Sequence, residues 1–219
     1  MKEHTVQRGA ETVIWDFNGT LVSDVELVLR ALNPLLHRRD MPCQTVDSYR
    51  DVFGFPIHEY YERLGFDLAE ESMEDLAGEF HETYMDGLPR CPLYPGVREA
   101  LDAFRLRGLR QFVLSAMEES RLRESIDRLG IAEYFTAVCG LDDLLAASKV
   151  ERGRRLIAEH HIVAARAILI GDTDHDAEVA AALGVTAILV SQGHQTAERL
   201  RQTGCRVVES VSCVPLLLS

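Results

Sequence analysis

Short apolar runs alternate along most of the chain with longer stretches in which apolar residues recur every three to four positions. The runs are typical of buried strands, which we expect at residues 12–15, 109–114, 134–139, 167–170, 185–190 and 206–208. The longer stretches have the period of amphipathic helices, at residues 97–107, 118–129, 149–160, 177–183 and 196–202. Strands and helices that alternate at this spacing predict parallel β-α-β units with right-handed crossovers. The pattern therefore predicts an α/β fold with a doubly wound parallel sheet.

Residues 23–90 interrupt this alternation. Helical periodicity occurs at 24–39, 57–64 and 70–85, a loop is expected at 52–56, and no segment alternates as a half-buried strand does. No flexible linker or low-complexity tract is present. We therefore expect a mostly helical insertion of three to five helices, residues 23–90, between two parts of one core, residues 1–22 and 91–219.

Composition restricts the classes of function. Of the 219 residues, 47% are hydrophobic and 26% are charged, as in ordinary globular proteins, and no segment approaches the ~20 apolar residues of a membrane helix. Residues 1–11 lack the apolar core of a secretory signal, so we expect a cytoplasmic protein. The five cysteines form no C-x-x-C pair, which disfavours a zinc site or a disulfide framework. The net charge of -12 argues against nucleic acid or a membrane as partner, but not against a phosphorylated substrate.

Three of the predicted strands end in a polar residue: Asp16, Ser115 and Asp172. Because the carboxyl ends of parallel strands share one edge of the sheet, these side chains can converge on one small volume. A carboxylate at that edge can attack an electrophile and carry it as a covalent intermediate. An aspartate in a short D-x-x-G pattern also occurs simply as a turn cap, and that alternative remains open at this point.

Further polar residues suit a phosphate site. Asp172 and the following Asp176 offer, with Asp16, the oxygen ligands that Mg²⁺ prefers, whereas we interpret Asp174 as a helix N-cap. Lys149, at the start of a predicted helix, can neutralise phosphate charge, although a solvated surface lysine is the ordinary alternative. Ser115 and the backbone N–H of Ala116 can donate hydrogen bonds to phosphate oxygens.

Together these residues form an ordered set: Asp16-x-Asn18-Gly19-Thr20, Leu114-Ser115, Lys149 and Gly171-Asp172-Thr173-x-x-Asp176. The set resembles the four motifs of the haloacid dehalogenase superfamily, and most closely its phosphoglycolate-phosphatase-like branch. The resemblance covers essentially the whole core. It implies a Rossmann-like core with an inserted all-helical cap.

The resemblance also implies a mechanism and a role for each site residue. Asp16 would attack phosphorus and form an aspartyl phosphate, which water then hydrolyses. Mg²⁺ would be held by Asp16, the backbone carbonyl of Asn18 and Asp172, with Asp176 ordering the surrounding waters. The phosphate would lie among a short series of groups: Gly19, Thr20, Ser115, Ala116 and Lys149. The substrate would be a small phosphorylated metabolite, chosen by the cap; residues 54–56 and 60–63 are our candidates for facing it.

Asn18 departs from the family pattern, because phosphatases of the family carry a second aspartate there that protonates the leaving group. Asparagine donates a hydrogen bond but does not shuttle protons at neutral pH. We therefore expect a magnesium-dependent phosphohydrolase with weakened turnover of alkyl phosphates, while acyl and aryl phosphates suffer less. One alternative is a weak or silent phosphate- or partner-binding protein. A dehalogenase-like hydrolase is disfavoured by Asp172 and Lys149, and a cap-lysine mechanism by the lack of any lysine in residues 23–90.

Overall fold

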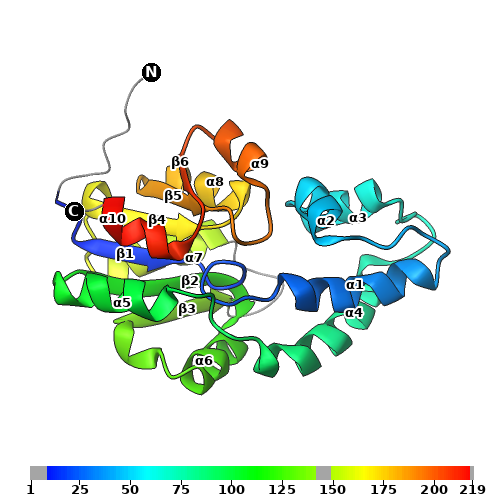
Figure 1. Ribbon diagram of the computed structural model, residues 1–219, viewed down its shortest axis with the longest axis horizontal. Helices are drawn as coiled ribbons and strands as arrows, with labels where there is room; N and C mark the ends of the chain where they lie inside the picture. Colours follow the sequence, from blue (N-terminus) through cyan, green and yellow to red (C-terminus); the bar gives the residue numbers. More distant parts are fainter. Residues whose placement is uncertain (1–8, 142–148, 218–219) are drawn as a thin grey trace.

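The computed structural model describes residues 9–141 and 149–217. Within them, six parallel strands form one sheet in the order β3-β2-β1-β4-β5-β6 (Figure 1). The strands are β1 (Thr12–Trp15), β2 (Arg110–Glu118), β3 (Ala137–Leu141), β4 (Ala167–Gly171), β5 (Thr186–Val190) and β6 (Arg206–Val208). Because the chain order reverses between β1 and β4, a crevice is expected at their carboxyl ends, where open α/β sheets bind ligands.

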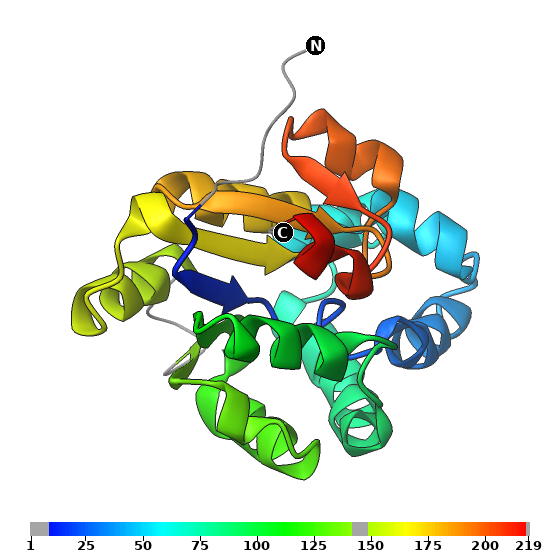
Figure 2. The same ribbon diagram turned by 60° about the vertical axis from the view of Figure 1, so that its left-hand side comes forward.

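Helices cover both faces of the sheet (Figure 2). They are α5 (Val97–Leu106), α6 (Glu119–Arg128), α7 (Lys149–Glu159), α8 (Asp174–Leu183), α9 (Ala197–Gln202) and α10 (Val214–Leu217). Trp15 of β1 packs into a core with α5 and α6, whereas its neighbour Ile14 packs into a second core with α7 and α8. Since successive strand residues point to opposite faces and both faces are buried, the apolar runs are continuous. The predicted doubly wound sheet is confirmed.

Four further α-helices lie together on one side of the sheet (Figure 1). They are α1 (Val25–His37), α2 (Val46–Val52), α3 (Ile57–Leu64) and α4 (Met73–Gly87), followed by the 3₁₀ turn η1 (Leu88–Arg90). Where the chain leaves and re-enters the core, Val22 forms a β-bridge with Leu93, so the two connections run side by side. The insertion is helical, as expected, and the boundaries at residues 22/23 and 90/91 stay a prediction.

Several predicted boundaries were wrong. Strand β2 continues past residue 114 to Glu118, and β3 begins at Ala137 because Ala132–Tyr134 form the 3₁₀ turn η2. Helix α2 was missed because Tyr49 is its single buried residue and a Thr45–Ser48 capping box, not an apolar period, specifies it. The N-cap of α8 is Thr173 and not Asp174, because Thr173 and Asp176 form a capping box. No helix within the described residues is both long and apolar enough to cross a bilayer.

Candidate active site

The carboxyl ends of β1 and β4 bring Asp16 and Asp172 together. The strands pair in parallel, and the backbone N–H of Asp16 donates to the carbonyl of Ile170 at 2.8 Å. Asp176, in the first turn of α8, joins them, so that one carboxylate oxygen from each aspartate lies within 4.8 Å of the other two. All three residues are less than 10% exposed. The aspartates therefore form one buried acidic cluster.

Lys149, the first residue of α7, brings a positive charge into this cluster. Its ammonium group donates to Asp16 Oδ1 at 2.5 Å and to Asp176 Oδ1 at 2.7 Å. Burial alone would lower the pKa of Lys149, but the two carboxylates raise it above its ordinary value. The lysine is 6% exposed, so the alternative of a solvated surface lysine is wrong.

One lysine does not balance the charge of the cluster. Burial raises the pKa of Asp16 to about 6, although the charge of Lys149 acts in the opposite direction. Burial also raises the pKa of Asp172 to about 7; His194 opposes this shift, and the negative charges of Asp16 and Asp176 add to it. A raised carboxyl pKa means that the surrounding cations and hydrogen bonds do not fully offset the cost of burying the charged form. The cluster therefore has an excess of negative charge.

The turns around the cluster aim Asp172 towards it. Thr20 Oγ1 donates to Asp172 Oδ1 at 2.9 Å, and the backbone N–H of His194 donates to Asp172 Oδ2 at 2.6 Å. The backbone N–H of Asp172 donates in turn to Asp176 Oδ2 at 3.1 Å. Gly19 has a φ of +72°, and a side chain there would collide with the Asp172 carboxylate and the His194 ring. Gly19 and Thr20 thus support the position of a carboxylate.

Ser115 and Ala116 lie on β2 beside the cluster. The backbone N–H of Met117 donates to Ser115 Oγ at 3.1 Å. Ser115 is buried and Ala116 is exposed, and both line the same cavity as Asp16 and Lys149. Of the residues expected to face the substrate, Phe55, Tyr60 and Tyr61 line this cavity, whereas Gly54, Pro56, Glu62 and Arg63 do not.

Asn18 has both hydrogens of its amide engaged within the protein. Its Nδ2 donates to Asp24 Oδ2 at 3.0 Å and to the hydroxyl of Tyr84 at 2.8 Å. The Tyr84 hydroxyl donates to the same oxygen of Asp24 at 2.5 Å. Because a carboxylate only accepts hydrogen bonds, the amide must turn its nitrogen towards Asp24. The amide of Asn18 therefore has no hydrogen left to donate to a leaving group in this conformation.

A buried polar chain that the sequence did not reveal extends from Asn18. It contains Asp24, Tyr84, His194 and Tyr49. His194 Nε2 lies 3.2 Å from Asp24 Oδ1, and its Nδ1 lies 2.9 Å from the hydroxyl of Tyr49. Burial alone would lower the pKa of His194, but Asp24 and Asp172 raise it to about 9, so the ring is charged at neutral pH. Burial alone would raise the pKa of Asp24, but His194 and hydrogen bonds lower it.

The charges and donors of the site fit a magnesium ion. Four buried carboxylates face two buried cations: Asp16, Asp24, Asp172 and Asp176 against Lys149 and His194. The formal charge of this group is -2, which a divalent cation balances, and carboxylate oxygens are the ligands that Mg²⁺ prefers. Asp16 and Asp172 are the residues best suited to hold it. Asp176 accepts from the Lys149 ammonium on one oxygen and from three donors of Asp172 and Thr173 on the other, whereas each oxygen of Asp172 accepts from a single donor.

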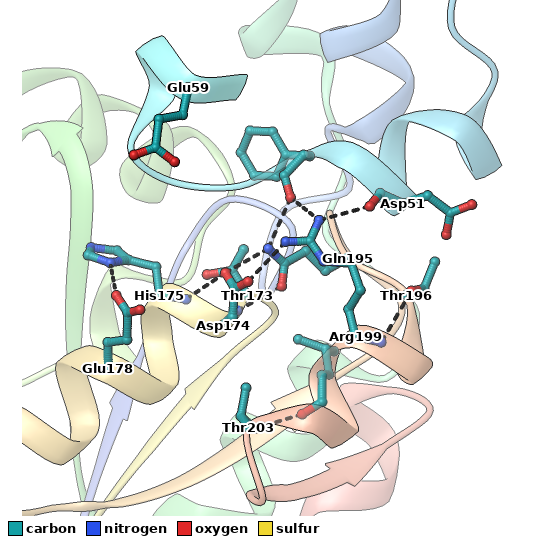
Figure 3. Close-up of polar contacts among 12 residues, drawn as sticks. Asp51, Glu59, Thr173, Asp174, His175, Glu178, Gln195, Thr196, Arg199 and Thr203 are labelled. Carbon is teal, nitrogen blue, oxygen red and sulfur yellow. Dashed lines mark hydrogen bonds and ion pairs between the residues drawn. The ribbon is translucent and has the colours of Figure 1, made fainter. Parts of the chain in front are cut away.

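Polar contacts join the helical insertion to this edge of the sheet. Figure 3 shows some of these contacts. Arg199 of α9 donates to the carbonyls of Asp51 and Phe53 and pairs with Asp174 Oδ2 at 2.9 Å. Gln195 also donates to the carbonyl of Phe53, at 3.1 Å. Since Asp51 and Phe53 lie at the end of α2, these contacts join the insertion to the sheet domain beside the cluster. Asp174 therefore has a structural partner outside the acidic cluster.

The chain is similar to known proteins along nearly its whole length. The family model of haloacid dehalogenase-like hydrolases matches residues 13–190. The chain is 28% identical over 222 residues to a phosphoglycolate phosphatase of Caulobacter vibrioides, covering 95% of this chain and 92% of the relative. It is 25% identical over 205 residues to the tyrosine-protein kinase PtkA of Mycobacterium tuberculosis, covering 93% and 70%. Its fold matches a haloacid dehalogenase-like hydrolase of Streptococcus pneumoniae with a TM-score of 0.83 at 16% identity, covering 96% and 99%.

The raised carboxyl pKa values predict that magnesium stabilises the protein more at pH 8 than at pH 5.5. A carboxyl group with a raised pKa stabilises the metal-free fold at low pH, and this contribution is lost as the pH rises through about 6 for Asp16 and about 7 for Asp172. Mg²⁺ relieves the repulsion at pH 8, whereas at pH 5.5 it must displace protons. At ~100 times its Kd it would add roughly 2.7 kcal/mol, or about 5–10 °C in Tm.

Thermal melts with and without MgCl₂ at the two pH values measure this difference. Asp172→Asn should remove most of the magnesium-induced shift, while Asp174→Asn, a neighbouring carboxylate outside the cluster, should keep it. Equal shifts at the two pH values, or equal shifts in the two variants, would show that the ion does not bind at the acidic cluster.

Proposed function

Because the chain belongs to the haloacid dehalogenase-like hydrolase family, we propose that it is a magnesium-dependent phosphatase of a small phosphorylated metabolite, with Asp16 as the nucleophile. The observation that carries this proposal is the buried ion pair of Asp16 and Lys149, 2.5 Å apart, beside Asp172, whose pKa is raised by burial. A carboxylate, a fixed cation and a second metal-binding oxygen are the groups that phosphoryl transfer needs. The similarity to a phosphoglycolate phosphatase and to a tyrosine-protein kinase supports phosphoryl chemistry as the type of reaction.

In the proposed reaction Asp16 attacks phosphorus, and the bond from phosphorus to the leaving oxygen breaks. The leaving group departs with the electron pair, and the phosphoryl group becomes an aspartyl phosphate. Lys149 and Ser115 hold its oxygens and keep it in line for attack. Water then attacks phosphorus, the bond between phosphorus and Asp16 breaks, and the released phosphate keeps the protons of the water while Asp16 is restored as a carboxylate. A magnesium ion bound by Asp16, the carbonyl of Asn18 and Asp172 would neutralise phosphate charge.

We further propose that residues 23–90 act as the cap that covers the site, on a core made of residues 1–22 and 91–219. The contacts of Arg199 and Gln195 with the end of α2 support this assignment, because they fasten the insertion beside the acidic cluster. Closure there would exclude water from the aspartyl phosphate until the leaving group departs.

A second candidate function is binding without turnover, and Asn18 is the observation that favours it. Both amide hydrogens of Asn18 are engaged by Asp24 and Tyr84, and asparagine carries no proton to transfer. A protein of this kind would still bind phosphate and Mg²⁺. Turnover, rather than binding, therefore separates the two candidates.

The nucleophile assignment predicts that Asp16→Asn abolishes turnover of p-nitrophenyl phosphate and acetyl phosphate. The loss should be on the order of 10³-fold or more, because an amide does not form the covalent intermediate. Steady-state phosphate release with MgCl₂ measures it, and Glu178→Gln, an exposed acid of α8, serves as the control that should retain activity. Turnover that survives Asp16→Asn would reject the assignment, and a wild type inactive on both substrates would favour the binding protein.

The acid–base assignment predicts that Asn18→Asp raises the turnover of alkyl phosphates. The new carboxyl group would lie beside Asp24, and two carboxyl groups in contact share a proton, so one of them has its pKa raised. That proton can reach a leaving alkoxide, a contribution typically worth ~10²–10⁴-fold. An aryl phosphate, whose leaving group needs no proton, should gain much less.

The ratio of kcat/KM for glycerol phosphate to that for p-nitrophenyl phosphate, measured for both proteins, reports this effect. Asn18→Ala is the matched control, because it removes the same hydrogen bonds without adding an acid. An unchanged ratio in Asn18→Asp would mean that position 18 has no part in proton transfer. Peptide mapping of each batch would establish that Asn18, which precedes a glycine, has not deamidated.

A further inference from the structure

The acidic cluster opens into a cavity of about 570 Å³ that extends between the helices of the insertion. Cavities of this size hold drug-sized ligands, for which ~300–1,000 Å³ is typical. Its inner end contains Asp16, Lys149 and Asp172, and its outer part is lined by side chains of α1, α3, α4 and the loop after α2. A phosphoryl group fills only the inner end. The rest of the substrate would have to occupy the outer part.

The outer part of the cavity is apolar and aromatic. Six of its side chains illustrate this composition: Val28, Leu32, Phe53, Ile57, Phe80 and Met85. Among the described residues that line the cavity, residues 28–85 contribute no lysine, arginine, aspartate or glutamate. Burial lowers the pKa of His81, which therefore stays uncharged at neutral pH. The outer part thus favours an uncharged group with a large apolar surface.

Among the lining residues that the structure describes, cations come only from the sheet domain. Apart from histidines, the described lining includes Lys149, which belongs to the phosphoryl end, and Arg121, which is exposed on α6 and interacts with Glu118. A second anionic group that reached the outer part of the cavity would find no cation among the lining residues 28–85, and a substrate as small as phosphoglycolate would not reach that part. Such a substrate would also leave most of the volume empty.

One polar group interrupts the apolar surface. Tyr60 lines the cavity, and its buried hydroxyl is the one side-chain oxygen or nitrogen of this kind without a hydrogen-bond partner among the residues that the structure describes. Tyr60 is 3% exposed, and its ring packs edge-on against Tyr49, Phe53 and Tyr61, which fix its direction. Burial raises its pKa, so the hydroxyl keeps its proton. Since buried polar groups are normally paired, this hydroxyl indicates a partner on the ligand.

Asn18 constrains the leaving group independently of the cavity. Without a proton donor at position 18, a leaving oxygen that is stable as an anion departs most easily, and a phenolate is such a group. The geometry points to a phosphate ester of a phenol as the substrate class, one whose aryl part is uncharged and carries a hydrogen-bond acceptor that pairs with Tyr60. This inference rests on the proposed phosphatase function and names the substrate of the same site.

Kinetics of the complete protein with MgCl₂ test the substrate class. The probes are phenyl phosphate, its ortho-, meta- and para-acetamido derivatives, phosphoglycolate and acetyl phosphate. We expect kcat/KM for the best acetamidophenyl phosphate to exceed that for phosphoglycolate by at least about 100-fold and that for phenyl phosphate by about fivefold. A preference for phosphoglycolate would overturn the inference. Turnover of acetyl phosphate without aryl preference would leave the phosphatase function intact and reject only the substrate class.

Tyr60→Phe tests the hydrogen bond itself. Loss of one neutral hydrogen bond should raise KM for the best acetamidophenyl phosphate about fivefold and leave the KM ratio of phenyl phosphate to acetyl phosphate unchanged. The melting temperature of the free variant should not fall, because the hydroxyl that is removed has no partner. Tyr134→Phe, a tyrosine of the sheet domain outside the cavity, is the matched control. An equal KM change for every substrate would contradict the assigned hydrogen bond.

Binding of phosphonates tests the substrate class even if the protein does not hydrolyse any of the phosphate esters. Benzylphosphonate presents an uncharged ring beside the phosphoryl-like group, whereas phosphonoacetate presents a second anion. In the presence of MgCl₂, benzylphosphonate should bind at least about tenfold more tightly by titration calorimetry. Tighter binding of phosphonoacetate would reject the aryl class, whatever the outcome for turnover.

Discussion

Three carboxylates and one ammonium group are buried within a few ångströms of each other, and the surrounding fold has to hold these charges together. Two unit charges 4.8 Å apart repel by about 3–4 kcal/mol at the effective dielectric constant typical of proteins. Lys149 offsets part of this repulsion for Asp16 and Asp176, but the pKa values of Asp16 and Asp172 remain raised. A site of this kind is stable only if the surrounding fold supplies enough energy to hold it together.

The parallel sheet supplies that support. Because β1 and β4 are neighbours at the point where the strand order reverses, their carboxyl ends present Asp16 and Asp172 to one another without any long loop. Both faces of these strands are covered, so every residue of β1 and β4 is buried. Gly19 allows the turn after β1 to approach Asp172 closely, and Thr20 fixes the orientation of that carboxylate. The fold thus fixes in advance where a cation and a phosphoryl group would bind.

Much of this arrangement could be predicted from local sequence. Asp16, Ser115 and Asp172 follow apolar runs, and a parallel sheet necessarily gathers such positions at one edge. Asp24, Tyr84 and His194 could not be found in this way, because each is an isolated polar residue whose partner lies far along the chain. Tyr84 contacts Asp24 only because α1 and α4 pack together, which no periodicity specifies. Residues 60–63 were predicted to face the substrate, and Tyr60 does line the cavity, but the missing partner of its hydroxyl follows only from the packing of the insertion.

We expect the acidic cluster to hold a divalent cation beside a carboxylate able to bind phosphorus. A crystal structure of the protein with Mg²⁺ and beryllium fluoride would show both at once. In that structure we expect a cation bound by Asp16 and Asp172, with the fluoride group on Asp16 in contact with Lys149 and Ser115. An intact ion pair between Lys149 and Asp16, with no cation in the cluster at millimolar Mg²⁺, would contradict it.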